Sequence, residues 1–508
     1  MNTGISSTIG YILRSLIYTS GETSMHDTQI TELLRNRLPA ACVLDSPEDL
    51  RPYECDGLSA YRSLPMVVVI PETVGQARAT LQLCAEHKVP VVARGAGTGL
   101  SGGALPLGDG VLLSMARFNR IVDIDTANRT ARVQPGVTNL SISKAAEPHG
   151  LYYAPDPSSQ IACSIGGNVA ENAGGVHCLK YGLTTHNILS LDILTMDGEQ
   201  MTVGSQALDT PGYDLLALMT GSEGLLGVIT EITVRLLPLP EVAQVVLAGF
   251  DSVDAAGAAV TAVIASGIIP AGLELLDRNA IRAVSKFIDA GYPPDATAIL
   301  LCELDGSRID VSTQIDDVKR IFREAGATEL KVSNNEAERQ RFWAGRKSAF
   351  PAMGRLSPDY YCMDGTIPRK HLARVLNEIE KLSAEYGLPI CNVFHAGDGN
   401  LHPLILYDAN KPGELERTEE LGGRILETCV AVGGTITGEH GVGVEKINQM
   451  CVQFNNAELE QFHRVKAAFD PAGLLNPGKA IPTLHRCAEF GAMHVHKGQL
   501  PHPELERF

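Results

Sequence analysis

The stretch Arg94-Gly-Ala-Gly-Thr-Gly-Leu-Ser-Gly-Gly103 decides the fold of the first half of this chain. Before it, the apolar runs Met66–Ile70 and Val89–Ala93 and the helical spacing over Val74–His87 predict a parallel β-α-β unit. The loop contains the G-x-G-x-x-G pattern of dinucleotide sites. In those sites the loop opens a helix, whereas here it leads to another apolar strand, Val111–Met115. We therefore expect a different α+β fold, in which backbone N–H groups of the loop bind a diphosphate.

A second loop, Pro155–Gly175, has a similar composition. Its small residues leave the backbone open to close approach, and its serine and asparagine side chains offer neutral hydrogen bonds. These residues are Ser158, Ala162, Ser164, Gly166, Gly167, Asn168 and Asn172. Gly-rich turns beside a small-residue helix would explain one such loop without a ligand. Two such loops, followed by Gly221-Ser-Glu-Gly224, favour a cofactor-binding site.

The overall composition is that of a folded, water-soluble protein of two to four domains, with 508 residues, 44% hydrophobic and 20% charged. A net charge of −17 argues against a nucleic-acid partner. The 11 cysteines form no C-x-x-C pair and no short-domain disulfide pattern, so we expect a cytoplasmic protein. Any iron–sulfur cluster would belong to another chain, because such clusters are usually held by closely spaced cysteines. No apolar run is long enough for a membrane helix, and the apolar patch within Met1–Thr23 does not predict a signal peptide.

A proline-containing linker, Leu236-Leu-Pro-Leu-Pro240, predicts a domain boundary near residue 240. The segments after it have the order βαββαβ, which is typical of a split, ferredoxin-like arrangement. They are strand Ala243–Phe250, helix Val253–Ser266, strands Gly272–Leu276 and Ala298–Glu303, helix Val311–Glu324 and strand Thr328–Val332. A comparable pattern over Tyr360–Thr437 predicts a larger antiparallel sheet. We expect an N-terminal extension and helix (1–50), a cofactor domain (51–240), a substrate domain (241–465) and a returning C-terminal segment (466–508).

Two short motifs concentrate metal-ligand and acid–base side chains. His395-Ala-Gly-Asp-Gly-Asn-Leu-His402 places two histidines around a turn, and Glu439-His440 follows the strand-like Thr435-Ile-Thr-Gly438. Two imidazoles and one carboxylate are a minimal set for a divalent metal such as Zn, Mn or Fe and leave positions open for substrate. A structural histidine pair is the alternative.

Together these residues resemble the vanillyl-alcohol-oxidase-type FAD-linked oxidoreductases, in the branch of the D-lactate and D-2-hydroxyglutarate dehydrogenases. The resemblance is greatest to the catalytic flavin subunits of bacterial glycolate oxidases. It runs over nearly the whole chain, from Arg51-Pro-Tyr-Glu-Cys-Asp-Gly57 to His485-Arg-Cys-Ala-Glu-Phe-Gly491. It implies an α+β protein with a two-part FAD-binding domain and a ferredoxin-like α/β substrate (cap) domain.

The resemblance also implies which residues bind FAD. They come from the two loops, from the segment after Gly221 and from Leu475-Asn-Pro-Gly478. The full set is Arg94, Gly95, Ala96, Gly97, Thr98, Gly99, Ser101, Pro157, Ser158, Gly166, Asn168, Asn172, Gly174, Gly224, Val228, Ile229 and Asn476. Thr98 stands where several relatives carry the histidine that attaches flavin covalently, so we expect non-covalent FAD.

By the same resemblance, His395, His402 and Glu439 are expected to bind a divalent metal, and His440 to be the general base. Passing a hydride from a 2-hydroxy acid to flavin requires loss of the hydroxyl proton, which a metal and a histidine base both assist. Arg346, in Trp343-Ala-Gly-Arg-Lys, matches the clamp for the substrate carboxylate. The alternative for this arginine is a solvated charge on a helix.

The expected substrate is a small monocarboxylate. Cys362 aligns with a lysine that contacts the second carboxylate in 2-hydroxyglutarate relatives. We expect oxidation of glycolate to glyoxylate, with electrons passed to a second flavin subunit and an iron–sulfur subunit, and membrane attachment only through these partners. The alternatives are a stand-alone FAD-dependent D-lactate dehydrogenase, a flavin-free metal hydrolase and a non-catalytic scaffold subunit. His177 and His186 are expected to have polar loop roles.

Overall fold

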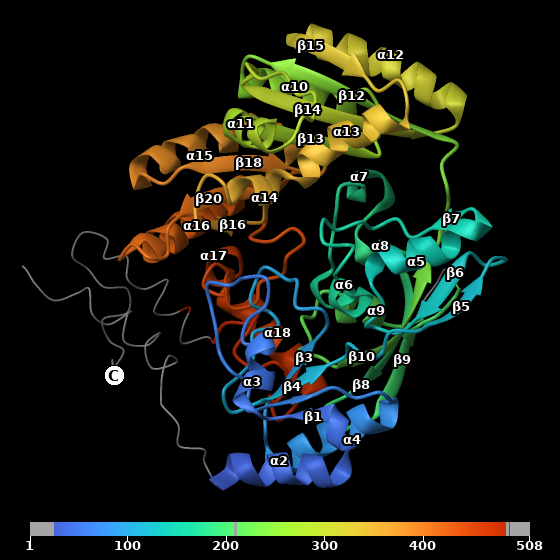
Figure 1. The fold of residues 1–508 in the computed structure, drawn as a ribbon, viewed down its shortest axis with the longest axis vertical. Coiled ribbons are helices and arrows are strands. Elements are labelled where there is room, and N and C mark those ends of the chain that lie inside the picture. The colour runs from blue at the N-terminus through green and yellow to red at the C-terminus, as the bar shows by residue number, and fades with distance from the viewer. Residues whose placement is uncertain (1–24, 208–210, 484–486, 488–508) are drawn as a thin grey trace, which may run out of the picture.

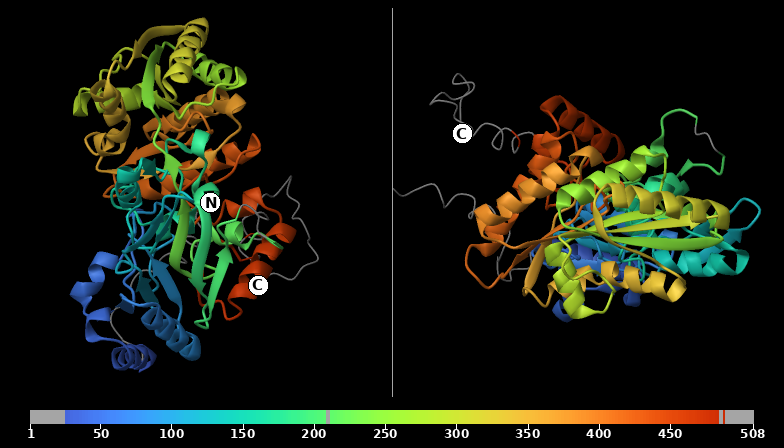
Figure 2. Two further views of the ribbon diagram at one scale, coloured as in Figure 1. Left: turned by 90° about the vertical axis from the view of Figure 1, so that its right-hand side faces the viewer. Right: turned by 90° about the horizontal axis from the view of Figure 1, so that it is seen from above.

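The computed structural model describes residues 25–207, 211–483 and 487, which form two halves stacked along the long axis of the molecule (Figure 1). The blue and teal elements make the lower half, and the green-yellow to orange elements make the upper half. The red helix α18 (Asn456–Phe469) returns to the lower half, as the side view also shows (Figure 2). Residue 465, at which the substrate domain was expected to end, therefore lies inside a helix of the lower half.

A four-stranded sheet carries the first glycine-rich loop. Its order is β1 (Val43–Leu44), β2 (Val67–Val69), β4 (Val111–Ser114) and β3 (Val91–Arg94). The last three strands are parallel, and α4 (Val74–His87) joins β2 to β3 as predicted. No helix separates β3 from β4, so the expectation of a non-Rossmann loop is confirmed. Helices α2 (Met25–Arg37) and α3 (Pro47–Leu50) precede β2.

A five-stranded antiparallel sheet carries the second loop. Its order is β5 (Ile121–Asp125), β6 (Thr130–Val133), β10 (Val228–Arg235), β8 (Ile188–Leu194) and β9 (Gln200–Gly204). The accompanying helices are α5 (Asn139–Ala146), α6 (Ile165–Glu171), α7 (Cys178–Tyr181), α8 (Thr184–Asn187) and α9 (Leu215–Met219). A ribbon of β7 (Leu151–Tyr152) and β11 (Leu237–Pro238) ends this half. Short 3-10 helices lie at Ala40–Cys42, Arg51–Tyr53, Glu147–His149 and, in the upper half, Arg369–His371.

The upper half is built on a seven-stranded antiparallel sheet. Its order is β15 (Ala327–Val332), β12 (Val242–Phe250), β14 (Ala298–Gly306), β13 (Gly272–Asp277), β18 (Ile390–Phe394), β20 (Pro403–Tyr407) and β16 (Asp359–Cys362). The first four strands have the ferredoxin-like order, and the expected second pattern extends the same sheet. Within the predicted βαββαβ segment one helix was not expected, namely α11 (Arg278–Phe287), which lies between β13 and β14. A ribbon of β17 (Gly365–Thr366) and β19 (Asn400–Leu401) completes this half.

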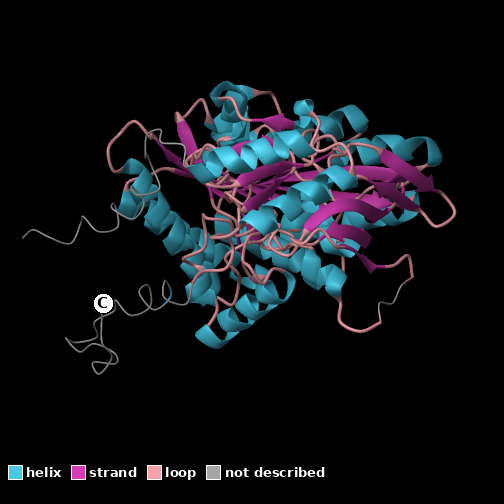
Figure 3. Ribbon diagram, turned by 90° about the horizontal axis from the view of Figure 1, so that it is seen from below, coloured by secondary structure: helices cyan, strands magenta, loops and turns pink. Residues whose placement is uncertain are grey.

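Helices cover both faces of this sheet (Figures 2 and 3). One face packs against α10 (Val253–Ala265), α12 (Arg308–Glu324), α15 (Leu372–Tyr386) and α16 (Glu414–Ala431). The other packs against α11, α13 (Glu336–Lys347) and α14 (Ala349–Met353). Alternate residues of β14 enter the two cores, with Leu300 in one and Leu301 in the other. The strand is therefore apolar at nearly every position.

The C-terminal part of the described chain returns to the glycine-rich loop. Leu475 bridges Val91 in parallel, and the Val91 carbonyl accepts a hydrogen bond from the backbone N–H of Asn476 at 2.8 Å. Cys451, in α17 (Met450–Gln453), forms a disulfide with Cys487. The cysteine spacing did not predict this bond, because its two residues are 36 positions apart. Within the described ranges, no helix combines the length and apolarity needed to cross a membrane.

Candidate active site

The two glycine-rich loops contact each other directly. A Cβ atom at Gly95 in the first loop would lie 2.2 Å from the hydroxyl of Ser164 in the second. A Cβ atom at Gly166 would lie 2.5 Å from Pro135, which precedes the second loop in the chain. Gly97 has φ of +70°, and a Cβ there would meet the guanidinium of Arg94. Arg94 itself donates to the Cys55 carbonyl at 2.8 Å. Glycine at these positions lets the loops close into one continuous wall.

This wall lines a cavity of about 450 Å³, within the usual size range of cofactor sites. Most residues expected to bind FAD line it, namely Arg94, Gly95, Ala96, Gly97, Thr98, Gly99, Pro157, Ser158, Gly166, Asn168, Gly174, Gly224, Val228 and Ile229. His402, Glu439 and His440 of the upper half line the same cavity. The fold thus brings the two groups of candidate residues together across the boundary between the halves.

Three residues of the expected set lie behind the wall. The carbonyl of Ser101 accepts backbone N–H groups of Val444 and Glu445. Asn172 ends α6 in the left-handed conformation. Asn476 donates its side-chain amide to the carbonyls of Gly103 and Glu223, at 3.0 and 2.7 Å. These three residues shape the loops and do not line the cavity.

A hairpin positions the two histidines of the first motif. His395 follows β18 and pairs through its backbone with Asn400, and Gly399, with φ of +87°, makes the turn between them. Nε2 of His395 lies 3.4 Å, and Nε2 of His402 3.1 Å, from the same oxygen, Oε1 of Glu439. Burial acts to raise the pKa of Glu439, but the two imidazoles outweigh it and hold the pKa well below its usual range. The three side chains form a compact group, as the motifs predict.

Glu439 also contacts the second glycine-rich loop. A Cβ atom at Gly174 would lie 2.4 Å from Oε2 of Glu439. The carboxylate can therefore occupy its position only because residue 174 has no side chain. Gly174 belongs to the cofactor wall, so this contact ties the histidine group to the cofactor half.

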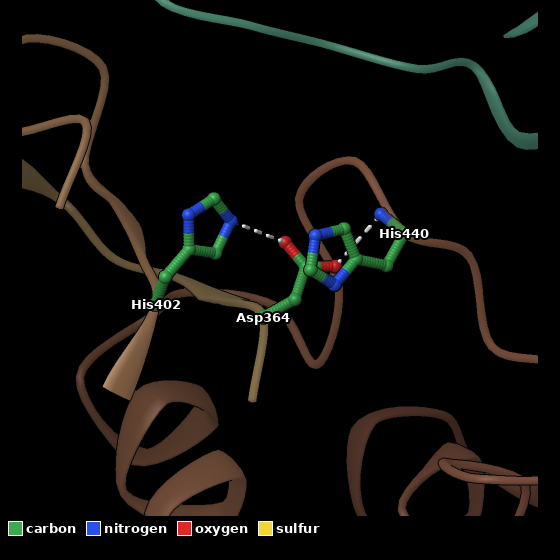
Figure 4. Close-up of side chains that lie close together, drawn as sticks. All are labelled: Asp364, His402 and His440. Carbon is green, nitrogen blue, oxygen red and sulfur yellow. Dashed lines mark hydrogen bonds and ion pairs between the residues drawn. The ribbon is translucent and has the colours of Figure 1, made fainter. Parts of the chain in front are cut away.

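Asp364 anchors the turn that carries Glu439 and His440 (Figure 4). Its buried carboxylate accepts the backbone N–H groups of Gly438 (3.0 Å), Glu439 (3.1 Å) and His440 (2.9 Å), and lies 3.2 Å from Nζ of Lys446. Asp364 was not among the residues expected to form the site. An aspartate in Met363-Asp-Gly-Thr366, directly after an apolar strand, is the signal that could have identified it.

His440 is positioned as a neutral imidazole. Its ring stacks on that of His402, with centroids 5.0 Å apart and an interplanar angle of 6°. Burial lowers the pKa of His440 to about 4, against the opposing charge of Asp364, and the nearby His402 acts in the same direction as burial. Its Nδ1 atom is buried without a hydrogen-bond partner among the described residues. A neutral ring nitrogen beside the cavity can accept a proton.

Arg346 is not the solvated helix charge that was the alternative for it, because it is only 2% exposed. Its Nε atom donates to Oε2 of Glu274 at 2.7 Å, and its Nη2 atom has no hydrogen-bond partner among the described residues. Arg346 does not line the cavity, but its exposed neighbour Lys347 does. Glu274 was also missed, although a lone charge inside the apolar strand over Gly272–Leu276 is a recognisable signal.

His177 joins the two halves. Its Nδ1 atom lies 2.8 Å from Asp156 in the lower half, and its Nε2 atom lies 3.1 Å from Glu303 in the upper half. Burial acts to lower the pKa of His177, but the two carboxylates raise it well above its usual range. This bridge is more than the polar loop role expected for His177. His186 keeps a local role and accepts a hydrogen bond from the backbone of Leu183.

Family models match both halves of the chain. A model described as "FAD binding domain" matches residues 65–204, and one described as "FAD linked oxidases, C-terminal domain" matches residues 239–480. The solved structure of 4-ethylphenol oxidase from Gulosibacter chungangensis superposes with a TM-score of 0.77 at 16% identity, covering 91% of this chain and 99% of that one. These matches define the class as flavin-dependent oxidoreductases and confirm the expected fold.

Two curated relatives narrow the class. Glycolate oxidase subunit GlcD of Escherichia coli K12 is 66% identical over 481 residues, which cover 95% of this chain and 96% of that protein. D-lactate dehydrogenase of Anaerostipes hadrus is 32% identical over 434 residues, covering 84% of this chain and 91% of that protein. The chain therefore belongs to the FAD-linked oxidase family, within the group of the GlcD subunits of glycolate oxidase.

Proposed function

We propose that this chain is the catalytic subunit of a glycolate oxidase and oxidises glycolate to glyoxylate with FAD. One observation carries the proposal: both glycine-rich loops and the side chains of His402, Glu439 and His440 line a single cavity. The greater identity to a glycolate oxidase subunit than to a D-lactate dehydrogenase favours glycolate over D-lactate.

The wall formed by the two glycine-rich loops leaves space for FAD and offers it hydrogen-bonding groups. A Cβ atom at Gly99 would meet nothing within 4 Å, whereas Ser158 and Asn168 provide polar groups at the cavity. FAD, when bound, accepts a hydride from the α-carbon of the substrate. The expected cofactor residues that line the cavity would hold it, and Thr98 supports a non-covalent attachment.

His395, His402 and Glu439 fit a divalent metal. Their ligand atoms all lie within 4.8 Å of one another. Nε2 of His402 is buried and lies 3.1 Å from Glu439, yet it makes no hydrogen bond within the described chain. A buried nitrogen of this kind is suited to a cation. A Zn, Mn or Fe ion held there would polarise the substrate hydroxyl group.

The remaining steps fall to residues of this chain. Oxidation of glycolate, with FAD as the hydride acceptor, would also require the loss of the proton from the hydroxyl group. His440 takes that proton at a ring nitrogen, for which its neutral state suits it. The substrate carboxylate needs a cation, and Nη2 of Arg346, which lies behind the cavity lining, is a buried cationic donor that lacks a partner in the described structure.

Anaerobic bleaching of the purified full chain tests the proposal. We expect a flavin absorbance spectrum that bleaches faster with glycolate than with D-lactate. Faster bleaching with D-lactate would favour the D-lactate dehydrogenase alternative. A protein that binds no FAD, even after reconstitution with added FAD, would refute the proposal.

We also propose that the electrons leave through a second flavin subunit and an iron–sulfur subunit of the same complex. The protein would then be cytoplasmic and would reach the inner face of the membrane only through these partners. The subunit name of the E. coli relative supports an assembly. Co-purification of a tagged chain from its own host, followed by iron analysis, would test this arrangement.

A further inference from the structure

Glu274 links two groups of the proposed site, the arginine Arg346 and the histidine His395. It lies in β13, is fully buried, and was assigned no role. Oε2 of Glu274 accepts a hydrogen bond from Nε of Arg346 at 2.7 Å, and Oε1 lies 2.8 Å from Nδ1 of His395. One carboxylate thus contacts the proposed substrate clamp and a proposed metal ligand at the same time.

The contact with His395 determines which ring nitrogen faces Glu439. Because a carboxylate accepts hydrogen bonds, it favours the tautomer of His395 that carries the proton on Nδ1. A cation between Nε2 and Oε1 of Glu439, which lie 3.4 Å apart, would then meet the lone pair of Nε2. Carboxylates that hold metal-binding histidines in this way orient the ring and raise its basicity, and losing them lowers metal affinity about 10–100-fold.

The contact with Arg346 determines where its free nitrogen lies. Both side chains of this ion pair are at most 2% exposed, so the charge of the arginine is balanced by Glu274 and not by water. With Nε occupied, the buried Nη2 atom keeps unused hydrogen-bonding capacity. A buried guanidinium with an unused N–H group is prepared for an anionic ligand.

We infer that Glu274 is a positioning residue that holds both Arg346 for the substrate carboxylate and His395 for the metal. This inference rests on the proposed function. The neighbours of Glu274 are both donors, Nε–H of Arg346 and Nδ1–H of His395. A glutamine at position 274 has only one oxygen, so its NH₂ group must face one of them. If His395 changes tautomer to accept this NH₂ group, its Nε2 becomes a donor and cannot bind a metal.

The test compares Glu274→Gln with Asp277→Asn in the full chain loaded with FAD. Asp277 lies on the same strand and binds Asn392 of β18 at 3.0 and 2.8 Å, but none of the proposed ligands. Zn²⁺ affinity is measured by competition with a chromogenic chelator, and flavin absorbance reports folding. For Glu274→Gln we expect Zn²⁺ affinity to fall about 10–100-fold and the KM for glycolate to rise. Asp277→Asn should leave both unchanged.

Wild-type Zn²⁺ affinity in Glu274→Gln would overturn the inference and leave the proposed function intact. Equal losses in Glu274→Gln and Asp277→Asn would also overturn it, because they would mark a general disturbance of the sheet. Wild-type protein that binds FAD and reacts with glycolate but binds no Zn²⁺ or Mn²⁺ would overturn the proposed metal site and this inference together. If Glu274→Gln does not retain FAD, Glu274→Asp replaces it. Glu274→Asp keeps the negative charge and should bind Zn²⁺ at least in part. A Glu274→Asp protein that retains FAD but binds no Zn²⁺ would refute the tautomer argument.

Discussion

Replacing Gly174 by alanine tests the contact between the cofactor wall and the histidine group. The new Cβ atom would lie 2.4 Å from Oε2 of Glu439, whereas ordinary contacts begin at 3.4 Å. Glu439 must therefore move by about 1 Å, and a displacement of this size in a catalytic group can cost about 10²-fold in rate. The added methyl group should also lower the free energy of unfolding by about 1–3 kcal/mol.

The assay is the rate of anaerobic flavin reduction by glycolate, measured after FAD content has been confirmed. Gly167→Ala is the matched control, because it adds a methyl group to the same wall and its nearest contact is the Ser164 hydroxyl at 3.2 Å. We expect Gly174→Ala to retain FAD and to lose about 10²-fold in rate, and Gly167→Ala to lose much less. Equal rates in Gly174→Ala and wild type would refute the close approach of Glu439 to this loop.

Three further predictions concern single side chains. Asp364→Asn should destabilise the protein by about 3 kcal/mol, because it leaves Lys446 with a weakened buried partner, and urea titration measures this loss; an unchanged midpoint would contradict the anchoring role. His440→Gln should keep FAD but slow flavin reduction about 10²–10⁴-fold, and stopped-flow absorbance decides whether it does. His177→Gln should reduce stability most at low pH: the pKa of His177 is raised in the folded state, so its contribution is complete below 6.5 and is lost as pH rises through the raised value. Its partner Glu303, whose pKa is lowered to about 2, stays charged throughout that range. Unfolding curves of the wild type and of His177→Gln, measured between about pH 5 and 9, should therefore converge as the pH rises.

Much of the local structure followed from the sequence alone. The helix over Val74–His87 has the bounds that its apolar spacing predicted, because helix period and caps are properties of neighbouring residues. The glycine-rich loops and the motifs around His395 and Glu439 were also recognisable, since their residues are close together in the chain. The helix α11 was not predicted, because its short, polar and amphipathic stretch lies between two strands that the expected βαββαβ order makes consecutive.

The partners of those residues were decided by the tertiary structure. Glu274 lies 121 positions before His395 and 72 before Arg346, and Asp364 lies 75 positions before Glu439. No local pattern joins residues so far apart, and the stability of a buried carboxylate depends on which donors the fold brings to it. The sequence by itself thus determined the chemical groups of the site and the loops that frame them. Only the tertiary structure decided which buried charges hold these groups in place, because burial and charge compensation depend on the packing of the whole chain.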